Sequence, residues 1–586
     1  MTDVDSGSRT ADSGPEPFPA GVRLEDPGLV RAWTRGATAA LRREREAIDR
    51  VNVFPVADAD TGTNLYLTLR EGDRAVAGAP ADATGPQLLA TLARAALLGA
   101  YGNSGVILSE WLRGLAVAAR HGGGPADLLG RAATSARSAV AQPAEGTILT
   151  AADAAAAAAR AVESGSAPDL GVGQAHDGGL LPVVTAAADA ARTAARASRD
   201  ELDDLRTAGV LDAGALGLVL VLDALVVAAA GVSEADGSME SVNLDQLLDP
   251  ASVPLVSAAA ASGVPGAGAP AGEAAGAGLH GAEAGAGALE LMFVLTRPVE
   301  AASDTASDTA SDTASDNVAA GLRAALGEVG DSVVVVGGDA GTGTGVWQAH
   351  VHTDHLDQAL AIAADAAGAG ALSQVHVRHL EAVAQHQWGV VAATSAPALT
   401  AELAHAGAVV LLTGGLGSTV EELTVDDVGR VVASTGARRV LLLGVPDGPA
   451  NATSAHVDVD EVVTVPTPTD VHAVVALAAL GTLLPVGLPD EPGDTPATDA
   501  RTIVDEALAG LTVTTVRGTG AVDALRAAAG PATTVATVLL DADAPDDLPD
   551  RLAAALAECA PEAELVVLAT GRPGDGVCLG TEEEHA

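Results

Sequence analysis

The sequence predicts a multidomain protein with an all-helical N-terminal domain, an α+β middle domain and a C-terminal α/β domain. Three observations support this fold class. The chain has 586 residues, too many for one hydrophobic core. Apolar residues recur with helical periodicity from Leu29 to about Val232. Beyond Trp388, short apolar runs alternate with helical patterns, which is typical of a mainly parallel sheet.

The domain boundaries follow from changes in composition. Polar, Pro- and Gly-containing sequence at the start favours disorder, and a long Gly/Ala/Pro-rich stretch separates the helical pattern from the first strand-like runs. We therefore expect a disordered tail at 1–25, a helical domain at 26–232, a low-complexity linker at 233–288, a middle domain at 289–385 and a C-terminal domain at 386–586.

Composition narrows the function classes. The formal net charge is −46, so the surface repels nucleic acid and anionic membranes, and neither is expected as a partner. All 31 basic residues are arginines, because the sequence contains no lysine. The GxxxxGK[ST] phosphate-binding loop is therefore excluded. The only cysteines, Cys559 and Cys578, exclude a disulfide framework over most of the chain.

One apolar run, Gly214 to Val232, is nearly long enough to span a bilayer. Asp223 lies in its middle, at an insertion cost of roughly 2.5–3.5 kcal/mol. We therefore expect a buried helix rather than a membrane span. The first residues have neither a basic start nor an apolar core, so no signal peptide is predicted and we expect a cytoplasmic protein.

The first candidate site is the stretch VNVFPVADADTGTN, which begins at Val51. In an extended segment, Asp58 and Asp60 point the same way and repel unless a cation lies between them, and carboxylate oxygens suit Mg²⁺. Thr61 and Thr63 follow, and Thr63 is predicted to be the N-cap of a helix that begins at Asn64. The free N–H groups of a helix N-terminus bind anions. This stretch therefore predicts a metal pair beside a phosphate site, although a capped helix with two solvated aspartates explains it about as well.

Three further turns repeat this pattern of small and polar residues at a helix start. Asn103, Ser104 and Gly105 open an amphipathic helix, EGTILT precedes another, and Asp212 and Gly214 precede the long apolar run. Each could be an ordinary helix–helix turn. Their repetition favours nucleotide binding at one rim of a helical bundle.

Taken together, NVFPVADADTGTN, GAYGNSGVILS, GTILT and VLDAG resemble the signatures of the DhaL domain, the nucleotide-binding domain of dihydroxyacetone kinases. More narrowly, they resemble the nucleotide-binding subunit of bacterial fatty acid kinase. The resemblance implies an antiparallel helical barrel in which aspartates hold two Mg²⁺ ions that bridge the phosphates of ATP. More weakly, the later segments resemble that family's middle domain and its DegV-type C-terminal domain.

The resemblance also implies residue roles. Asp58 and Asp60 match the metal-binding and catalytic pair, and Asn52 is a weaker candidate for a further metal contact. The matches to the nucleotide-binding positions are Thr61, Thr63, Asn64, Asn103, Ser104, Gly105, Asp212 and Gly214.

Two departures from the family pattern stand out. Ala59 lies where the family has glycine, and alanine is strained if that position needs a positive φ. In the middle domain, Met292 takes the place of a cysteine that joins two histidines at a metal site in some relatives, while His350 and His352 remain. Because a thioether is a poor zinc ligand, two strand histidines without metal are the favoured interpretation.

The function that this resemblance implies is ATP- and Mg²⁺-dependent phosphorylation of a fatty acid held by a separate DegV-like fatty-acid-binding protein, with a possible homodimer of the kinase chain. A carboxylate acceptor needs no general base because it is already ionised near neutral pH, and no histidine stands beside the aspartate pair. The alternatives are a dihydroxyacetone-type small-molecule kinase and a non-catalytic nucleotide-binding scaffold.

Overall fold

A computed structural model provides the three-dimensional description of the chain. The residues that it describes are 23–166, 179–231, 242–244, 247, 287–298, 308–339, 344–380, 388–414, 416, 419–420, 423–446, 459–481 and 500–583. The predicted tail and the predicted linker therefore lie almost entirely outside the described residues.

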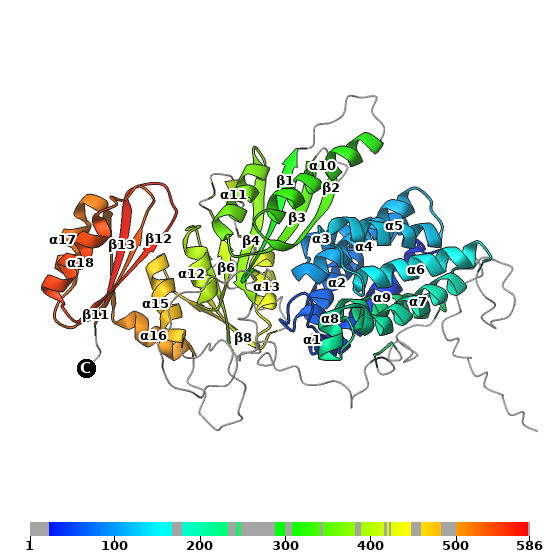
Figure 1. The fold of residues 1–586 in the computed structure, drawn as a ribbon, viewed down its shortest axis with the longest axis horizontal. Helices are drawn as coiled ribbons and strands as arrows, with labels where there is room; N and C mark the ends of the chain where they lie inside the picture. The colour runs from blue at the N-terminus through cyan, green and yellow to red at the C-terminus, as the bar shows by residue number, and fades with distance from the viewer. Residues whose placement is uncertain are drawn as a thin grey trace, which may run out of the picture.

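The N-terminal part is helical, as expected (Figure 1). Its helices are α1 (Pro27–Asp49), α2 (Thr61–Gly78), α3 (Gly85–Leu98), α4 (Gly102–Arg120), α5 (Pro125–Ala139), α6 (Ile148–Glu163), α7 (Leu180–Glu201), α8 (Asp203–Ala208) and α9 (Ala213–Ala229).

Local sequence explains where several of these helices begin. The Asp26 side chain accepts hydrogen bonds from the first N–H groups of α1, and Pro27 stands at the first helical position. Thr84 and Gln87 form a reciprocal capping box at α3. Such caps satisfy N–H groups that have no partner within the helix, so they fix the helix starts.

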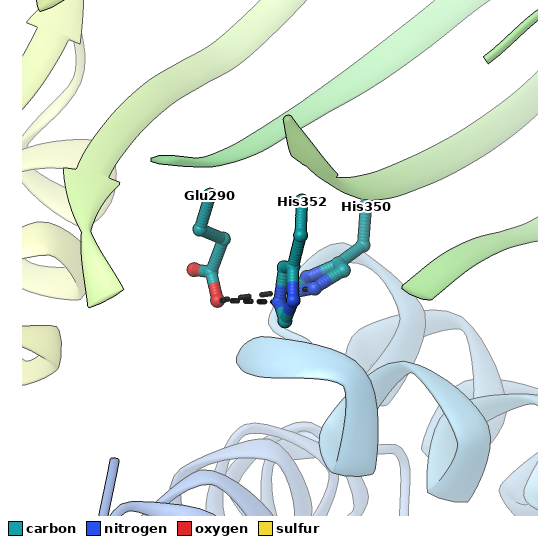
Figure 2. A group of neighbouring side chains, drawn as sticks. All are labelled: Glu290, His350 and His352. Carbon is teal, nitrogen blue, oxygen red and sulfur yellow. Dashed lines mark ion pairs between the residues drawn. The ribbon is translucent and has the colours of Figure 1, made fainter. Parts of the chain in front are cut away.

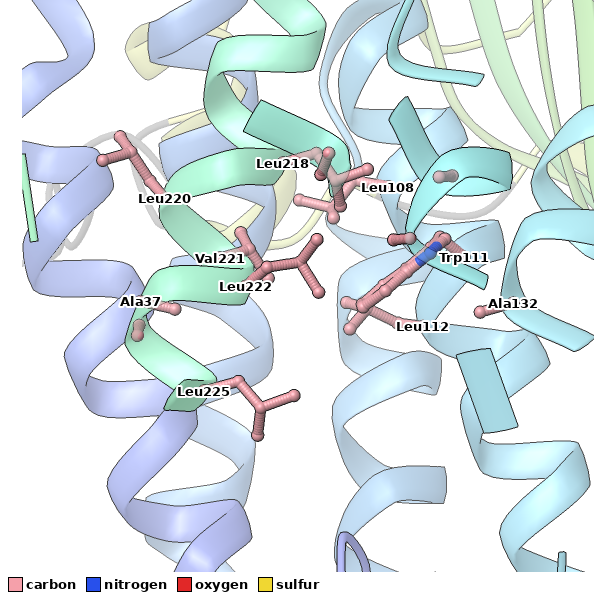
Figure 3. Packing of buried hydrophobic residues seen from close by; sticks show 14 of the residues in the cluster. Ala37, Leu108, Trp111, Leu112, Ala132, Leu218, Leu220, Val221, Leu222 and Leu225 are labelled. Carbon is pink, nitrogen blue, oxygen red and sulfur yellow. The ribbon is translucent and has the colours of Figure 1, made fainter. Parts of the chain in front are cut away.

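The helices pack as a ring. Each helix from α1 to α7 contacts the next, and α9 contacts both α7 and α1. Side chains of α4 and α9, among them Trp111 and Leu218, meet in the shared core (Figure 3). Small residues allow close approach: a Cβ added at Gly114 of α4 would lie 2.5 Å from the Cα of Ala132 in α5.

The apolar run in α9 is buried in this core, as the sequence predicted. Its one charged residue, Asp223, forms an ion pair with Arg192 of α7 at 2.5 Å. Across the described residues, no helix combines the length and apolar character needed to cross a bilayer.

The middle and C-terminal parts share one sheet, whose strands follow the order β2-β3-β1-β4-β6-β5-β8-β9, while β7 (Thr419–Val420) pairs with β4. Strands β1 to β4 pair antiparallel, β4 and β6 also pair antiparallel, and β5, β6, β8 and β9 pair parallel. These strands are β1 (Leu289–Pro298), β2 (Asp331–Asp339), β3 (Thr344–Thr353), β4 (Ala371–His379), β5 (Trp388–Thr394), β6 (Ala408–Leu412), β8 (Arg439–Leu443) and β9 (Glu461–Val465).

A separate sheet in the order β10-β13-β11-β12 completes the chain (orange to red in Figure 1). Its strands are β10 (Leu511–Arg517), β11 (Thr533–Leu540), β12 (Glu564–Ala569) and β13 (Gly576–Glu583). The helices that accompany the two sheets are α10 (Asp308–Gly327), α11 (Leu356–Ala367), α12 (Leu399–His405), α13 (Val425–Ser434), α15 (Asp470–Leu480), α16 (Ala500–Ala509), α17 (Ala521–Ala528) and α18 (Leu548–Cys559). The α/β character expected for the C-terminal part is therefore confirmed.

The helical domain rests against the first sheet. An apolar cluster joins Leu97, Ala100 and Val106 of the helical domain to Met292 and Val334 of β1 and β2. The Gln348 amide on β3 donates to the Ala100 carbonyl at 3.0 Å. This contact places the start of α4 beside the sheet, where the candidate site lies.

Candidate functional site

The aspartate pair lies in the segment between α1 and α2, close to the interface with the sheet. Asp60 is the N-cap residue of α2 and is buried, with 8% of its surface exposed. The side chain of Asp58 is 10% exposed. Burial and the neighbouring Asp60 raise the pKa of the Asp58 carboxyl well above its usual value. The pair therefore favours a proton or a further cation.

Helix α2 begins three residues earlier than the sequence analysis predicted, at Thr61, so the N-cap assignment of Thr63 is wrong. Asp49, the last residue of α1, takes the capping role. Its carboxylate accepts from the Thr63 N–H at 3.0 Å and from the Thr63 hydroxyl at 2.7 Å. Burial raises the pKa of Asp49 to about 7. The Thr63 hydroxyl thus supports the helix start through a residue of the preceding helix.

Asn52, the weaker candidate for a further metal contact, joins the two ends of this loop through hydrogen bonds. Its amide donates to Asp58 at 2.5 Å, and its carbonyl oxygen accepts from the Thr61 hydroxyl at 2.8 Å. Thr61 also lies 3.3 Å, oxygen to oxygen, from the Ser104 hydroxyl at the start of α4. The first two predicted turns therefore form one continuous hydrogen-bonded unit.

The start of α4 packs directly on α2. Gly102 has φ +54°, and an added Cβ there would lie 2.3 Å from the side-chain nitrogen, Nδ2, of Asn64. A Cβ at Gly105 would lie 2.2 Å from the Thr68 hydroxyl, so these glycines permit the contact. The Asn103 side-chain oxygen is buried and has no hydrogen-bond partner among the described residues. Such an atom is costly unless a ligand or water pairs with it.

The other two turns form a second unit at the same rim. The Asp212 carboxylate caps α9 through the Ala215 N–H at 2.7 Å and also accepts from backbone N–H groups of Gly214 and of Ile148 in α6. An added Cβ at Gly217 of α9 would lie 2.2 Å from the Leu65 side chain of α2, so the two units are adjacent. The predicted gathering of helix starts is therefore present, with Asp212 acting as a buried cap.

The pH response of stability provides a test of this cap. Burial raises the pKa of Asp212 to about 7 from 3.8, so the native state binds a proton more tightly than the unfolded state does. The stability that this bound proton gives to the native state therefore falls as pH rises from about 4 to 7. We expect Asp212→Asn, measured by chemical unfolding, to gain stability relative to wild type between pH 5 and pH 8. Asp204→Asn, at an exposed position of α8, is the control, and parallel pH profiles of Asp212→Asn and wild type would contradict the assignment.

Ala59, between the two aspartates, has φ +55°. This is the positive φ that the sequence analysis considered, and an alanine there costs about 1–2 kcal/mol relative to ordinary backbone. We expect Ala59→Gly to raise the free energy of unfolding by about 1 kcal/mol, because glycine tolerates this conformation. Thermal unfolding checks this, with Ala57→Gly, which lies outside the positive-φ positions, as the matched control. A destabilised Ala59→Gly variant would show that this backbone is not strained.

The sheet contributes a residue that the sequence analysis missed. Arg378 of β4 is 4% exposed, and its guanidinium donates to Asp60 at 2.6 Å and lies 3.5 Å from Asp58. Through Nε and the same Nη2 that reaches Asp60, it also donates two hydrogen bonds of 2.9 Å to Glu290 of β1. Burial disfavours the charged guanidinium, but Glu290, Asp60 and Asp58 outweigh this and raise the pKa of Arg378.

Two histidines of β3, His350 and His352, lie beside Glu290 of β1 (Figure 2). His350 and His352 lie 3.8 and 3.9 Å from the same Glu290 oxygen. Burial lowers the pKa of His350 to about 3, so this imidazole is neutral. Glu290, His350 and His352 each offer a ligand atom within 4.8 Å of one another, a donor set that suits Zn²⁺. Met292, at the position of the relatives' cysteine, packs in the interdomain apolar cluster instead. The residue that joins the two histidines in this structure is therefore Glu290.

The three residues missed from the sequence are Asp49, Glu290 and Arg378. Asp49 carried a weak signal, since a carboxylate is unfavourable at a helix C-terminus unless it has another task. Glu290 stands in otherwise apolar strand sequence, LELMFV, and Arg378 alternates with valines in VHVRHL; a charged residue in such a strand calls for a partner. Their partners could not be read from the sequence.

Comparison with known proteins supports the resemblance. Residues 55–227 match the DAK2 domain, the DhaL-type family. Residues 307–387 match the FakA-like middle domain of the fatty acid kinase family. The first match contains both aspartates and all four turns, and the second contains the histidines and Arg378.

The curated relatives match over part of their length. Protein YloV of Bacillus subtilis is 32% identical over 196 residues, which is 33% of this chain and 33% of that protein. An uncharacterized protein of Staphylococcus haemolyticus is 30% identical over 217 residues, 36% of each chain. The crystal structure of the dihydroxyacetone kinase from C. freundii in complex with AMP-PNP and Mg²⁺ aligns over 39% of this chain and 37% of that chain, with 19% identity and a TM-score of 0.27.

Proposed function

We propose that this chain, whose residues 55–227 match the DAK2 domain, is an ATP- and Mg²⁺-dependent kinase. The proposed acceptor is a fatty acid carboxylate presented by a separate DegV-like fatty-acid-binding protein, and the product is an acyl phosphate. One observation carries the proposal: two aspartates, the buried Asp60 and the largely covered Asp58, lie where the starts of α2 and α4 meet, inside the DAK2 match.

The residues present fit a nucleotide and its metal. Asp58 and Asp60 supply the oxygen ligands that Mg²⁺ prefers. Burial and the charge of Asp60 raise the pKa of Asp58, and a divalent cation would offset both effects. The unpartnered oxygen of Asn103 and the hydroxyl of Ser104 stand at the adjacent helix start. Helix N-termini bind phosphate through their N–H groups. When bound, Mg²⁺ would neutralise charge on the transferring phosphoryl group.

The chain's own residues position the groups. Asn52 fixes Asp58, and Asp49 fixes the first turn of α2 through Thr63. Gly102 and Gly105 keep α4 close enough for Ser104 to reach Thr61. A carboxylate acceptor is ionised near neutral pH, so its phosphorylation requires no base. Burial lowers the pKa of His350 to about 3, so this imidazole is a weak proton acceptor.

The match of residues 307–387 to the FakA-like middle domain of the fatty acid kinase family supports the choice of acceptor. The C-terminal α/β part is the proposed DegV-like region, and a homodimer of the kinase chain remains part of the proposal. The curated relatives are matched over 22% to 36% of their length, so the acceptor is argued from the domain match and the chemistry of the site.

Transfer of the γ-phosphate of labelled ATP tests the proposal. The full chain is incubated with a bacterial fatty-acid-binding protein loaded with fatty acid, and acyl phosphate is measured by hydroxamate trapping. Acyl phosphate that depends on the binding protein and on Mg²⁺ is the expected result. Phosphorylation of dihydroxyacetone instead would identify a small-molecule kinase. Nucleotide binding without transfer to either acceptor would identify a scaffold.

A further inference from the structure

The guanidinium of Arg378 lies where a cation between the two aspartates would lie. One nitrogen, Nη2, is 2.6 Å from an Asp60 oxygen and 3.5 Å from an Asp58 oxygen. The other Asp58 oxygen accepts from Asn52. One oxygen of each aspartate therefore already faces a positive charge, and that charge comes from the chain itself.

Arg378 is held firmly in this place. Arg378 and Glu290 are directly opposite each other on the paired strands β4 and β1. Two parallel hydrogen bonds of 2.9 Å join Nε and Nη2 to the two Glu290 oxygens, a bidentate arrangement that fixes the plane of the guanidinium. Both residues are buried, so moving Arg378 away would leave Glu290 as an uncompensated charge, which is strongly unfavourable.

We propose that Arg378 is a built-in cation of the nucleotide site, which takes one of the two cation positions implied for the Asp58–Asp60 pair and leaves room for a single divalent cation. This inference rests on the proposed function, since it concerns the same site. The second domain thereby contributes a positioning residue to the aspartates of the first. The site is complete only while the sheet is docked on the helical domain.

Manganese EPR of the full-length protein tests this inference. Mn²⁺ replaces Mg²⁺ in such sites, and two Mn²⁺ ions held close together couple magnetically while a single ion does not. The titration uses Mn²⁺ with a non-hydrolysable ATP analogue. The test variant is the double substitution E290Q/R378Q, which removes the guanidinium without leaving Glu290 as an unpaired buried charge. The control is E110Q/R113Q, which removes another Arg–Glu pair, on α4. Asp58→Asn together with Asp60→Asn measures weak binding elsewhere on this acidic chain.

The expected result is one uncoupled Mn²⁺ per wild-type or control chain, and a second, coupled Mn²⁺ in E290Q/R378Q. A coupled pair in the wild type would overturn the inference even if the double variant does not fold. The same count in the wild type and E290Q/R378Q would also overturn it, as would a wild type that binds none while that variant binds. Absence of specific Mn²⁺ from both would overturn the proposed function as well, whereas one ion in each leaves that function standing.

Discussion

Replacing Arg378 with methionine is expected to lower the free energy of unfolding by about 3–5 kcal/mol, the cost of removing one partner of a buried ion pair. The side chain is 5% exposed, and its loss leaves Glu290 and Asp60 without their shared positive partner. Chemical unfolding followed by tryptophan fluorescence measures this, because Trp347 is buried in the core of the same sheet.

The matched control for this variant removes both charges. In E290M/R378M no glutamate is left without its arginine, so the loss of stability is expected to be well below that of Arg378→Met. If Arg378→Met alone were as stable as the wild type, the guanidinium would not be needed to hold the sheet against the aspartate loop.

Asp58→Asn and Asp60→Asn are expected to lower phosphoryl transfer by about a hundredfold to a thousandfold, the size of effect seen when one electrostatic contact to a developing charge is removed. The carboxamide has nearly the same shape as the carboxylate but lacks its charge, so cation binding fails while the fold persists. Turnover is measured with the acyl phosphate assay, and folding by circular dichroism.

Asp82→Asn is the matched control for these variants, because Asp82 is an exposed aspartate of the same domain. It is expected to retain wild-type turnover. Wild-type turnover in either Asp58→Asn or Asp60→Asn would remove the aspartate pair from the mechanism.

The helical domain and its rim of helix starts could be predicted from the sequence because their signals are local. Apolar periodicity marks the helices, and small and polar residues such as Asn103 and Ser104 mark where they begin. The start of α2 was misplaced because its cap comes from Asp49, fourteen positions before Thr63. A propensity argument assigns a cap to the nearest suitable residue and has no means to find one on the previous helix.

The contribution of the sheet could not be predicted, for a different reason. Asp60 and Arg378 are 318 positions apart in the sequence, yet they form a hydrogen bond of 2.6 Å. That contact depends on how two domains dock, which composition and periodicity do not encode. Alternation of side chains along a strand places His350 and His352 on one face of β3. It could not show that Glu290, from the neighbouring strand, lies beside them.

The central claim is that the Asp58–Asp60 loop is a metal-dependent nucleotide site, and calorimetric titration of ATP into the full chain tests it most directly. The titration is run with and without Mg²⁺, on the wild type and on Asp58→Asn. The account predicts binding of ATP to the wild type that requires Mg²⁺ and is lost in the variant. Equal binding by the wild type and Asp58→Asn, or no binding by the wild type, would contradict it.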